Sequence, residues 1–315
     1  MRTGVSTMAH HDPKLIQLEI AEMQSLHLDD VLVCAQENDF VYFPGKITFT
    51  PKIAKDYGLR PLAIFWGALN LFGGGRSSQF LLDHPTGLQI ARDGSQRAAG
   101  CYMNALCRSR IMEMIDVIIE RGFMGYFVDE PTPLRECFCP ACRAAYDAWY
   151  GTSLMKADAV QLEAFRQRCV VDYVQSIATY CKSIAPELET IACLMPHDDA
   201  MWEHAASIET LDNLGTDLYW VNNDRDVAEM TAPIGKLEDL CQRNGKMHHE
   251  WLQCWNVRAG REQRIVDQGR VLVGMKPDAL YVWAWKAQLG TSETCDDPTA
   301  AWEAARQVLS LAGRS

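Results

Sequence analysis

Short apolar runs rich in β-branched and aromatic residues alternate with amphipathic helical patterns along the whole chain. This alternation predicts a (β/α)8 barrel, the TIM-barrel fold class, because eight such runs can be counted. The chain has 315 residues, 48% of them hydrophobic, and a barrel of this kind uses about 250 residues or more. No repeat, low-complexity tract or Ser/Gly linker divides it. We therefore expect residues 1–315 to form one barrel domain.

The eight predicted strands are Thr3–Met8, Val31–Ala35, Leu62–Trp66, Tyr126–Val128, Thr190–Met195, Asp217–Val221, Met247–Gln253 and Leu280–Trp285. The main predicted helices are Lys14–Leu26, Ile47–Tyr57, Asn104–Arg121, Leu162–Ile184, Asp226–Arg243 and Pro298–Leu311. Asp12 as N-cap and Pro13 in the first turn are typical of a helix start. Gly58 and Gly122 are typical of helix ends.

A doubly wound open sheet is the main alternative fold. It would require a Gly-rich turn after the first strand. Gly73-Gly74-Gly75 follows the third predicted strand instead and lacks the Lys-Ser/Thr pair of a phosphate-binding loop. The barrel is therefore the better prediction.

Composition limits the partners. The net charge is −11 and no long basic run occurs, which argues against nucleic acid. Met1–Pro13 has no apolar stretch of signal-peptide length, and no window reaches the length of a membrane span. The twelve cysteines are unevenly spaced, so most should be reduced thiols. We expect a cytoplasmic protein without membrane contact, and the sequence leaves a homo-oligomer open.

Polar and aromatic residues gather where the predicted strands end. Active residues of such barrels lie at the C-terminal strand ends. The mixture of carboxylates, Trp, Asn, Gln and His suits a small carbohydrate, because Trp faces stack on sugars and polar groups bind hydroxyls. The expected substrate-binding residues are Glu37, Trp66, Arg76, Asp129, His197, Trp220, Asn222, Trp251, Trp283, Trp285, Lys286 and Gln288.

Two glutamates are candidates for catalysis. Glu130 follows the fourth strand and Glu250 lies on the seventh, on opposite sides of the expected barrel mouth. Cleavage of a glycosidic bond needs one carboxyl group that protonates the leaving oxygen and another that attacks or activates water. The sequence therefore predicts Glu130 and Glu250 as the catalytic pair. The alternative for each is a solvated or ion-paired carboxylate.

Other candidates carry equally plain structural alternatives. Asp129 either contacts an Arg or a sugar hydroxyl or anchors the strand end. Trp283 and Trp285 alternate along one predicted strand, so one would form the floor of the sugar site; the alternative is core packing. Glu37 and Arg76 lie on predicted loops, where a solvated side chain is the default.

Cys137, Cys139 and Cys142 form a C-x-C-x-x-C cluster directly after the fourth strand. Three thiolates this close suit tetrahedral Zn²⁺ with a fourth ligand. Cys101 is the preferred fourth ligand, and Cys107 is the alternative. Four cysteines make a closed, structural site, and no organic cofactor is expected. A zinc deaminase would need an upstream His-x-Glu, and a metal-dependent amidohydrolase would need His-x-His after the first strand; neither occurs.

The stretch GCYMNALCR…GYFVDEPTPLRECFCPACRAAYDAWYG resembles the catalytic barrel of family 42 glycoside hydrolases, the β-galactosidases of clan A. The stretch from Asp83 to Gly94 is similar to a His-Pro…Asp-Gly segment of that family. The resemblance implies that Glu130 is the acid/base, that Glu250 is the nucleophile and that Trp283 or Trp285 lines the sugar site. It also implies that Cys101, Cys137, Cys139 and Cys142 hold zinc. Asp129 departs from the clan, which has Asn there.

The sequence thus predicts a retaining glycoside hydrolase for a small glycoside or oligosaccharide. A retaining enzyme holds its two carboxyl groups about 5–5.5 Å apart. Two alternatives belong to other classes. One is a carbohydrate-binding barrel without hydrolysis, and the other is a transglycosylase or lyase that uses the same strand ends.

Overall fold

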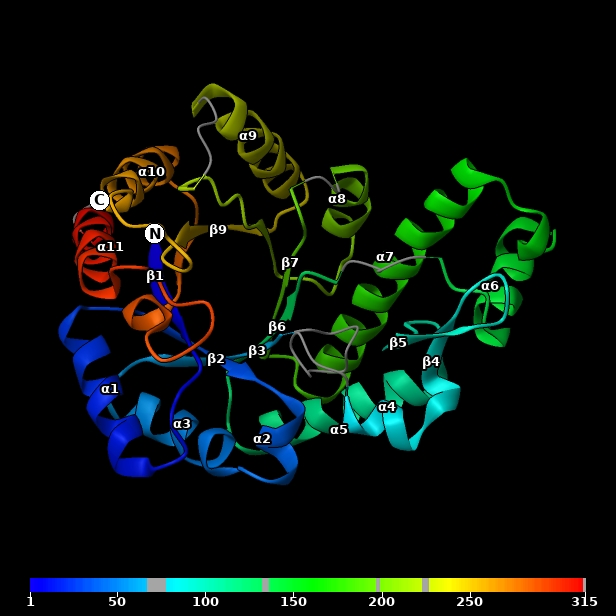
Figure 1. Ribbon diagram of the computed structural model, residues 1–315, viewed down its shortest axis with the longest axis horizontal. Coiled ribbons are helices and arrows are strands. Elements are labelled where there is room, and N and C mark those ends of the chain that lie inside the picture. The colour runs from blue at the N-terminus through cyan, green and yellow to red at the C-terminus, as the bar shows by residue number, and fades with distance from the viewer. Residues whose placement is uncertain (67–77, 132–135, 197–198, 223–226, 314–315) are drawn as a thin grey trace.

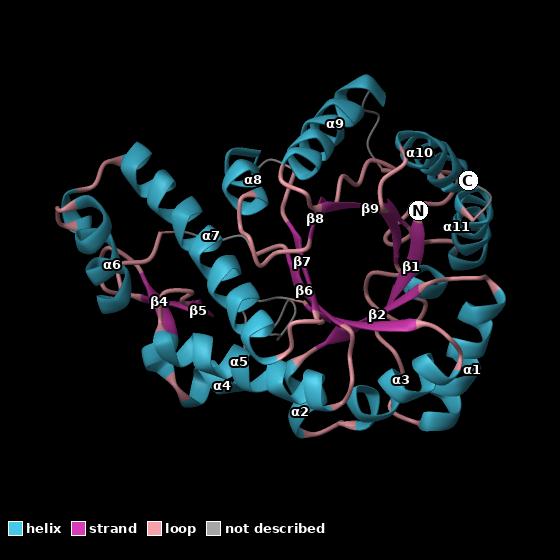
Figure 2. Cartoon of the chain, turned by 180° about the vertical axis from the view of Figure 1, so that it is seen from behind, coloured by secondary structure: helices cyan, strands magenta, loops and turns pink. Residues whose placement is uncertain are grey.

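Eight parallel strands close into a barrel in the computed structural model, which describes residues 1–66, 78–131, 136–196, 199–222 and 227–313. Their order around the barrel is β1-β10-β9-β8-β7-β6-β3-β2, and helices surround them as an outer layer (Figure 2). The predicted (β/α)8 fold is confirmed. The barrel strands are β1 (Arg2–Thr7), β2 (Asp30–Ala35), β3 (Arg60–Phe65), β6 (Gly125–Asp129), β7 (Glu189–Cys193), β8 (Asn213–Thr216), β9 (Met247–Gln253) and β10 (Ala279–Trp283).

The described helices are α1 (Pro13–Ser25), α2 (Glu37–Val41), α3 (Gly45–Asp56), α4 (Gln79–Asp83), α5 (Ala105–Glu120), α6 (Pro140–Tyr150), α7 (Ala159–Ile184), α8 (Asp199–Ala206), α9 (Val227–Arg243), α10 (Glu262–Met275) and α11 (Pro298–Ala312). As predicted, Asp12 caps α1, accepting from the backbone N–H of Lys14 and Leu15. Gly58 has a φ of +80°, which L-residues rarely adopt. None of the described helices has the length and apolar character needed to cross a membrane.

Two apolar layers hold the barrel together. Side chains alternate along each strand, so one set fills the interior, including Phe127, Trp251 and Tyr281, and the other packs against the helices. Residues paired across neighbouring strands share a face. Trp251 pairs with Tyr281 in the barrel interior, and Glu250 pairs with Leu280 of the outer layer.

A smaller module stands beside the barrel. It contains the antiparallel pair β4 (Leu88–Ile90) and β5 (Gln96–Gly100), helix α6 and the start of α7 (Figure 1). Its separate apolar core includes Phe138, Tyr146 and Phe165 together with the cysteine cluster. Because only seven positions separate Glu130 from Cys137, this module holds the far end of the loop that follows β6.

One strand differs from the prediction. The sixth barrel strand is Asn213–Thr216, and Asp217–Val221 follows it. The strand N-L-G-T is short and only weakly apolar, so the strand was predicted in the more apolar run that follows it. Gly215 is required here because a Cβ would lie 2.3 Å from the His249 carbonyl oxygen on β9. The shift places Asp217 at the barrel mouth.

Candidate active site

The carboxyl ends of the strands surround a cavity of about 260 Å³. Five residues predicted from the sequence line it together: Trp66, Asp129, Glu130, Trp283 and Gln288. Its volume is close to the lower end of small-ligand sites, roughly 300 Å³. The remaining lining residues that the structure describes are Asp217, Tyr219, Trp255 and Glu293.

Glu130 leaves the end of β6 in a left-handed conformation, with a φ of +40°. Such a conformation is uncommon for a residue with a Cβ and costs free energy, and it is found often at functional sites. The backbone N–H of Glu130 donates to the Cys193 carbonyl oxygen at 3.1 Å, so β7 fixes the position of this turn. The side chain is exposed at the cavity. The turn therefore points an accessible carboxyl group into the barrel mouth.

Three carboxyl groups cluster on this side of the cavity. Burial raises the pKa of Asp129 well above its usual range, and the neighbouring Glu130 raises it further. Burial, followed by a hydrogen-bonding contact with Glu130, likewise raises the pKa of Asp217. Two carboxyl groups make such a contact only when one carries a proton, and no Lys, Arg or His is among the described lining residues. The cluster therefore retains a proton at pH values where an isolated carboxyl group is ionised.

Aromatic side chains form much of the remaining wall. The rings of Trp66 and Trp283 lie 6.1 Å apart, and those of Tyr219 and Trp255 lie 5.5 Å apart in an edge-to-face arrangement. Trp251 packs beneath Trp283 in the barrel interior, at 5.8 Å. These contacts hold the cavity aromatics in fixed orientations, and their flat apolar faces suit one side of a sugar ring or another small apolar group.

Two of the lining residues each hold a buried donor without a partner among the described residues: Gln288 Nε2 and Trp255 Nε1. Gln288 is only 4% exposed and ends a turn in which Lys286, Ala287 and Gln288 all have φ between +49° and +59°. Such consecutive left-handed residues are unfavourable without glycine. A buried donor without a partner costs about 1–3 kcal/mol, and a ligand with acceptor oxygens would satisfy both donors.

Glu250 does not reach the cavity, and its predicted place at the barrel mouth is wrong. It pairs with Leu280 on the face of β9 that packs against the helices. It is fully buried, and its Oε1 lies 2.7 Å from His248 Nε2. Burial raises the pKa of Glu250. The interior face of the same strand carries Trp251, so a side chain one position away must point outward. The structure does not bring Glu130 and Glu250 together.

The prediction that Trp285 shares a face with Trp283 is also wrong. Strand β10 ends at Trp283, and the turn after it directs Trp285 outward against Trp302, at 4.8 Å. Its Nε1 donates to Glu19 at 3.0 Å. Lys286 lies on the same outer side and forms an ion pair with Glu22 at 2.7 Å. Neither residue lines the cavity.

Four other predicted substrate-binding residues have structural positions away from the cavity lining. Glu37 accepts from the backbone N–H groups of Gln79 and Phe80 at the start of α4. Asn222 bridges two loops through Asn256 and Arg258. The other two are buried: Trp220 belongs to the outer core, and Trp251 to the barrel interior. Arg76 and His197 lie outside the described residues.

Four lining residues were not predicted from the sequence: Asp217, Tyr219, Trp255 and Glu293. Asp217 and Tyr219 were placed inside a strand, which hid their position after β8. Trp255 lies two residues after β9 and Glu293 lies ten residues after β10, in segments without a clear pattern. In the segment after β8, Asp217 and Tyr219 alternate with the core residues Leu218 and Trp220. This alternation could have indicated the two lining residues if the end of the strand had been placed correctly.

The sulfur atoms of Cys101, Cys137, Cys139 and Cys142 lie within 4.8 Å of one another. Cys101 Sγ is 3.5 Å from Cys139 Sγ and 3.4 Å from Cys142 Sγ. A tetrahedral ion with sulfur at about 2.3 Å would separate its ligands by about 3.8 Å. Backbone N–H groups of Ile90 and Cys142 point at two of the sulfurs, which supports thiolate charge. The four residues can therefore hold one metal ion. Cys107 is not in the group; its Sγ donates to the Gly87 carbonyl oxygen.

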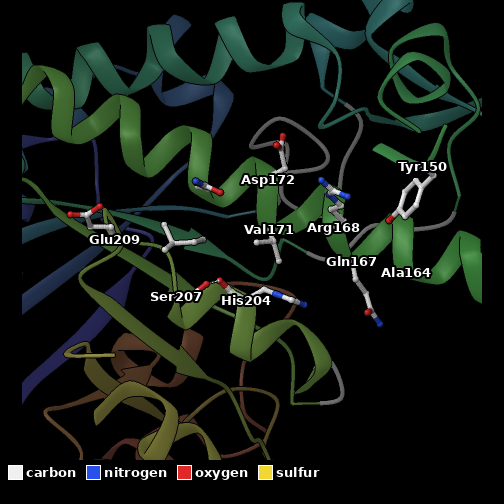
Figure 3. A pocket seen from close by; sticks show the side chains of 11 residues that line it. Tyr150, Ala164, Gln167, Arg168, Val171, Asp172, His204, Ser207 and Glu209 are labelled. Carbon is white, nitrogen blue, oxygen red and sulfur yellow. Dashed lines mark hydrogen bonds between the residues drawn. The ribbon is translucent and has the colours of Figure 1, made fainter. Parts of the chain in front are cut away.

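A larger cavity, about 780 Å³, lies away from the strand ends between α7 and α8. Figure 3 shows its lining side chains, among them Arg168, Asp172 and His204. Arg168 packs over Trp149 at 4.2 Å and Asp172 forms an ion pair with Arg108, so both have structural partners. The mouth cavity, with its clustered carboxyl groups, is the stronger candidate for chemistry.

No protein-family model and no curated protein matches the sequence. Solved structures do match. A β-galactosidase from the Antarctic haloarchaeon Halorubrum lacusprofundi has a TM-score of 0.74 at 16% identity, covering 99% of this chain and 58% of its own. A β-galactosidase from Bacillus circulans sp. alkalophilus has a TM-score of 0.76 at 10% identity, covering 100% and 56%.

The catalytic domain of a β-amylase from Paenibacillus polymyxa has a TM-score of 0.70 at 9% identity, covering 99% of this chain and 98% of its own. The chain thus spans little more than half of the two β-galactosidases. At these identities the likeness establishes the barrel fold. Two of the three proteins are β-galactosidases, the type of enzyme that the sequence resembles.

Proposed function

We propose that this protein is a retaining glycoside hydrolase for a small carbohydrate, with Glu130 as the acid/base. The carboxyl cluster of Asp129, Glu130 and Asp217 carries the proposal, because it retains a proton beside an aromatic wall. Glycosidic cleavage needs a proton for the leaving oxygen. Glu130 is the exposed member of the cluster, so its carboxyl group is the one a substrate oxygen can reach.

The cavity also fits the binding of a sugar. The ring faces of Trp66 and Trp283 offer stacking surfaces. The buried donors of Gln288 and Trp255, which have no partner among the described residues, match hydroxyl or carbonyl oxygens. The fold likeness to two β-galactosidases and a β-amylase points to the same class of substrate.

We infer that the four-cysteine group holds a structural Zn²⁺. An all-sulfur, tetrahedral site favours zinc and leaves no position open for substrate. Zinc would fix the small module and so the far end of the loop that starts at Glu130. Twelve free cysteines fit a reducing, cytoplasmic compartment.

The test is the leaving-group dependence of the Glu130→Gln variant. Loss of the general acid should lower kcat/KM by about 10³-fold or more for alkyl glycosides and far less for 2,4-dinitrophenyl glycosides, which need no protonation. Unchanged melting would show that the fold is intact. Wild-type turnover of an alkyl glycoside by the variant would contradict the proposal, as would sugar binding by the wild type without hydrolysis of any glycoside, which would favour a binding barrel.

A further inference from the structure

The carboxyl groups of the cavity are distributed unevenly. Asp129 ends β6 and Glu130 follows it, and Asp217 directly follows β8, in contact with Glu130. A retaining pair straddles the anomeric carbon at about 5–5.5 Å, and two carboxyl groups in direct contact leave no room for that carbon between them. Asp217 is therefore not the attacking partner of Glu130.

The sequence predicted the nucleophile on β9, but no carboxyl group of this strand reaches the cavity. Glu250 faces the helices, and the last residue of the strand is Gln253. The Gln253 side chain is tied on both sides, since its Oε1 accepts from the Val221 N–H at 3.0 Å and its Nε2 donates to the Trp255 carbonyl at 3.3 Å. Among the described lining residues, the other carboxylate is Glu293, on the loop after β10.

Asp217 instead has the features of a group that holds a ligand donor. It is 7% exposed, and its Oδ1 has no hydrogen-bond donor among the described residues. The Tyr219 and Trp255 rings line the same cavity, and within the described part of the chain Trp255 Nε1 and Gln288 Nε2 are donors without a partner. The site thus offers one acceptor, two donors and apolar ring faces. An acetamido group presents the complement: one N–H, one carbonyl oxygen and one methyl group.

We propose that the substrate is a 1,2-trans 2-acetamido-2-deoxy glycoside whose own acetamido oxygen is the nucleophile, with Asp217 accepting the hydrogen bond of the acetamido N–H. This inference rests on the proposed function. Glu130 remains the acid/base, and Glu293, on the loop after β10, binds sugar hydroxyl groups.

The two steps balance without a cofactor. In the first, a lone pair of the acetamido oxygen forms a bond to C1, the C1–O glycosidic bond breaks, and the leaving oxygen takes the Glu130 proton. The N–H of the resulting oxazolinium ring stays hydrogen-bonded to Asp217 Oδ1. In the second, the Glu130 carboxylate takes a proton from water, the water oxygen bonds to C1, and the ring C1–O bond returns its electrons to the amide. The anomeric configuration is retained.

The experiment compares 4-nitrophenyl β-glycosides that differ only at C2, in the gluco and galacto series. We expect kcat/KM at least about 100-fold higher for the 2-acetamido substrates than for the 2-hydroxy ones. Replacing acetyl by trifluoroacetyl should lower kcat about 100-fold or more, because fluorine withdraws electrons from the attacking oxygen. Asp217→Ala should lose about 10²-fold or more on the acetamido substrate, and Glu250→Gln serves as the matched control outside the cavity.

Equal turnover of 2-hydroxy and 2-acetamido substrates would overturn the inference while leaving the proposed function intact. So would restoration of a Glu293→Ala variant by azide, because azide replaces an enzyme nucleophile and Glu293 would then be that nucleophile. Retained configuration in the product, followed by NMR, is required by both mechanisms. Inversion would overturn the inference and the retaining mechanism together, and failure to hydrolyse either substrate series would instead count against the proposed function itself.

Discussion

The two ends of the barrel carry carboxyl groups in opposite surroundings. At the N-terminal end, Glu189 accepts from Arg2 at 2.6 and 2.9 Å and also contacts Arg60, while Asp30 lies 3.0 Å from Arg60 and accepts from Tyr281. Burial raises the pKa of Asp30 to about 7, and Arg2 opposes that rise. At the mouth, no cation is present among the described lining residues, and burial raises the pKa values of Asp129 and Asp217 well above their usual range.

This difference separates stability from chemistry. Paired carboxylates are costly to disturb, because removal of one partner leaves an uncompensated charge. Clustered carboxyl groups without a cation among the described lining residues retain a proton instead, as the raised pKa values of Asp129 and Asp217 indicate, and Glu130 is the member of that cluster that a substrate can reach. Carboxyl groups therefore form stabilising ion pairs at the N-terminal end of the barrel and a proton-holding cluster at the mouth.

The largest expected effect comes from the proposed zinc site in the core of the small module. Cys137→Ser should abolish binding of about one zinc ion per chain and release residues 88–100 and 137–169 to limited proteolysis, with loss of activity. Cys107→Ser is the matched control, because Cys107 lies outside the cluster. Metal analysis and proteolysis of both variants test this. A metal-free Cys137→Ser protein as resistant and active as the wild type would show that the centre does not support the mouth.

At the opposite end, Glu189→Gln should lower the free energy of unfolding by about 2–3 kcal/mol, because Arg2 and Arg60 lose their shared carboxylate. Activity at low temperature should not change. Urea unfolding measures the loss, and the exposed neighbour Glu187→Gln is the control. A Glu189 variant with full stability and reduced turnover would reverse the assignment of the two ends.

The smallest effect is a shift in pH dependence. The mouth cluster must hold a proton for catalysis, so activity should fall as the pH rises through its raised pKa. Asp217→Asn removes the member of the cluster whose pKa burial and Glu130 raise, so the cluster holds its proton less tightly and the alkaline limb of kcat/KM should move to lower pH by about one unit. Asp267→Asn, on the exposed face of α10, should leave the limb in place. A shift to higher pH would contradict the shared proton.

The fold and half of the site were predictable from the sequence. Glu130 was predicted because it directly follows a buried strand, and active residues of such barrels lie at the C-terminal strand ends. Strand β9 was predicted with its observed bounds, yet Glu250 was misplaced. Both faces of this strand are buried. Alternation therefore predicts that Glu250 and Trp251 point to opposite faces, but it does not predict which of the two points into the barrel. Asp217 was missed because the strand before it is short and depends on Gly215.

The most direct test of the central claim compares Glu130→Gln with Glu250→Gln on one substrate. The structure places one glutamate in the mouth and the other against the helices. We predict that Glu130→Gln loses about 10³-fold or more in kcat/KM with unchanged unfolding, while Glu250→Gln keeps kcat/KM within about threefold and is less stable, because it weakens a buried hydrogen bond to His248. Full activity in Glu130→Gln together with inactive, stably folded Glu250→Gln would contradict it.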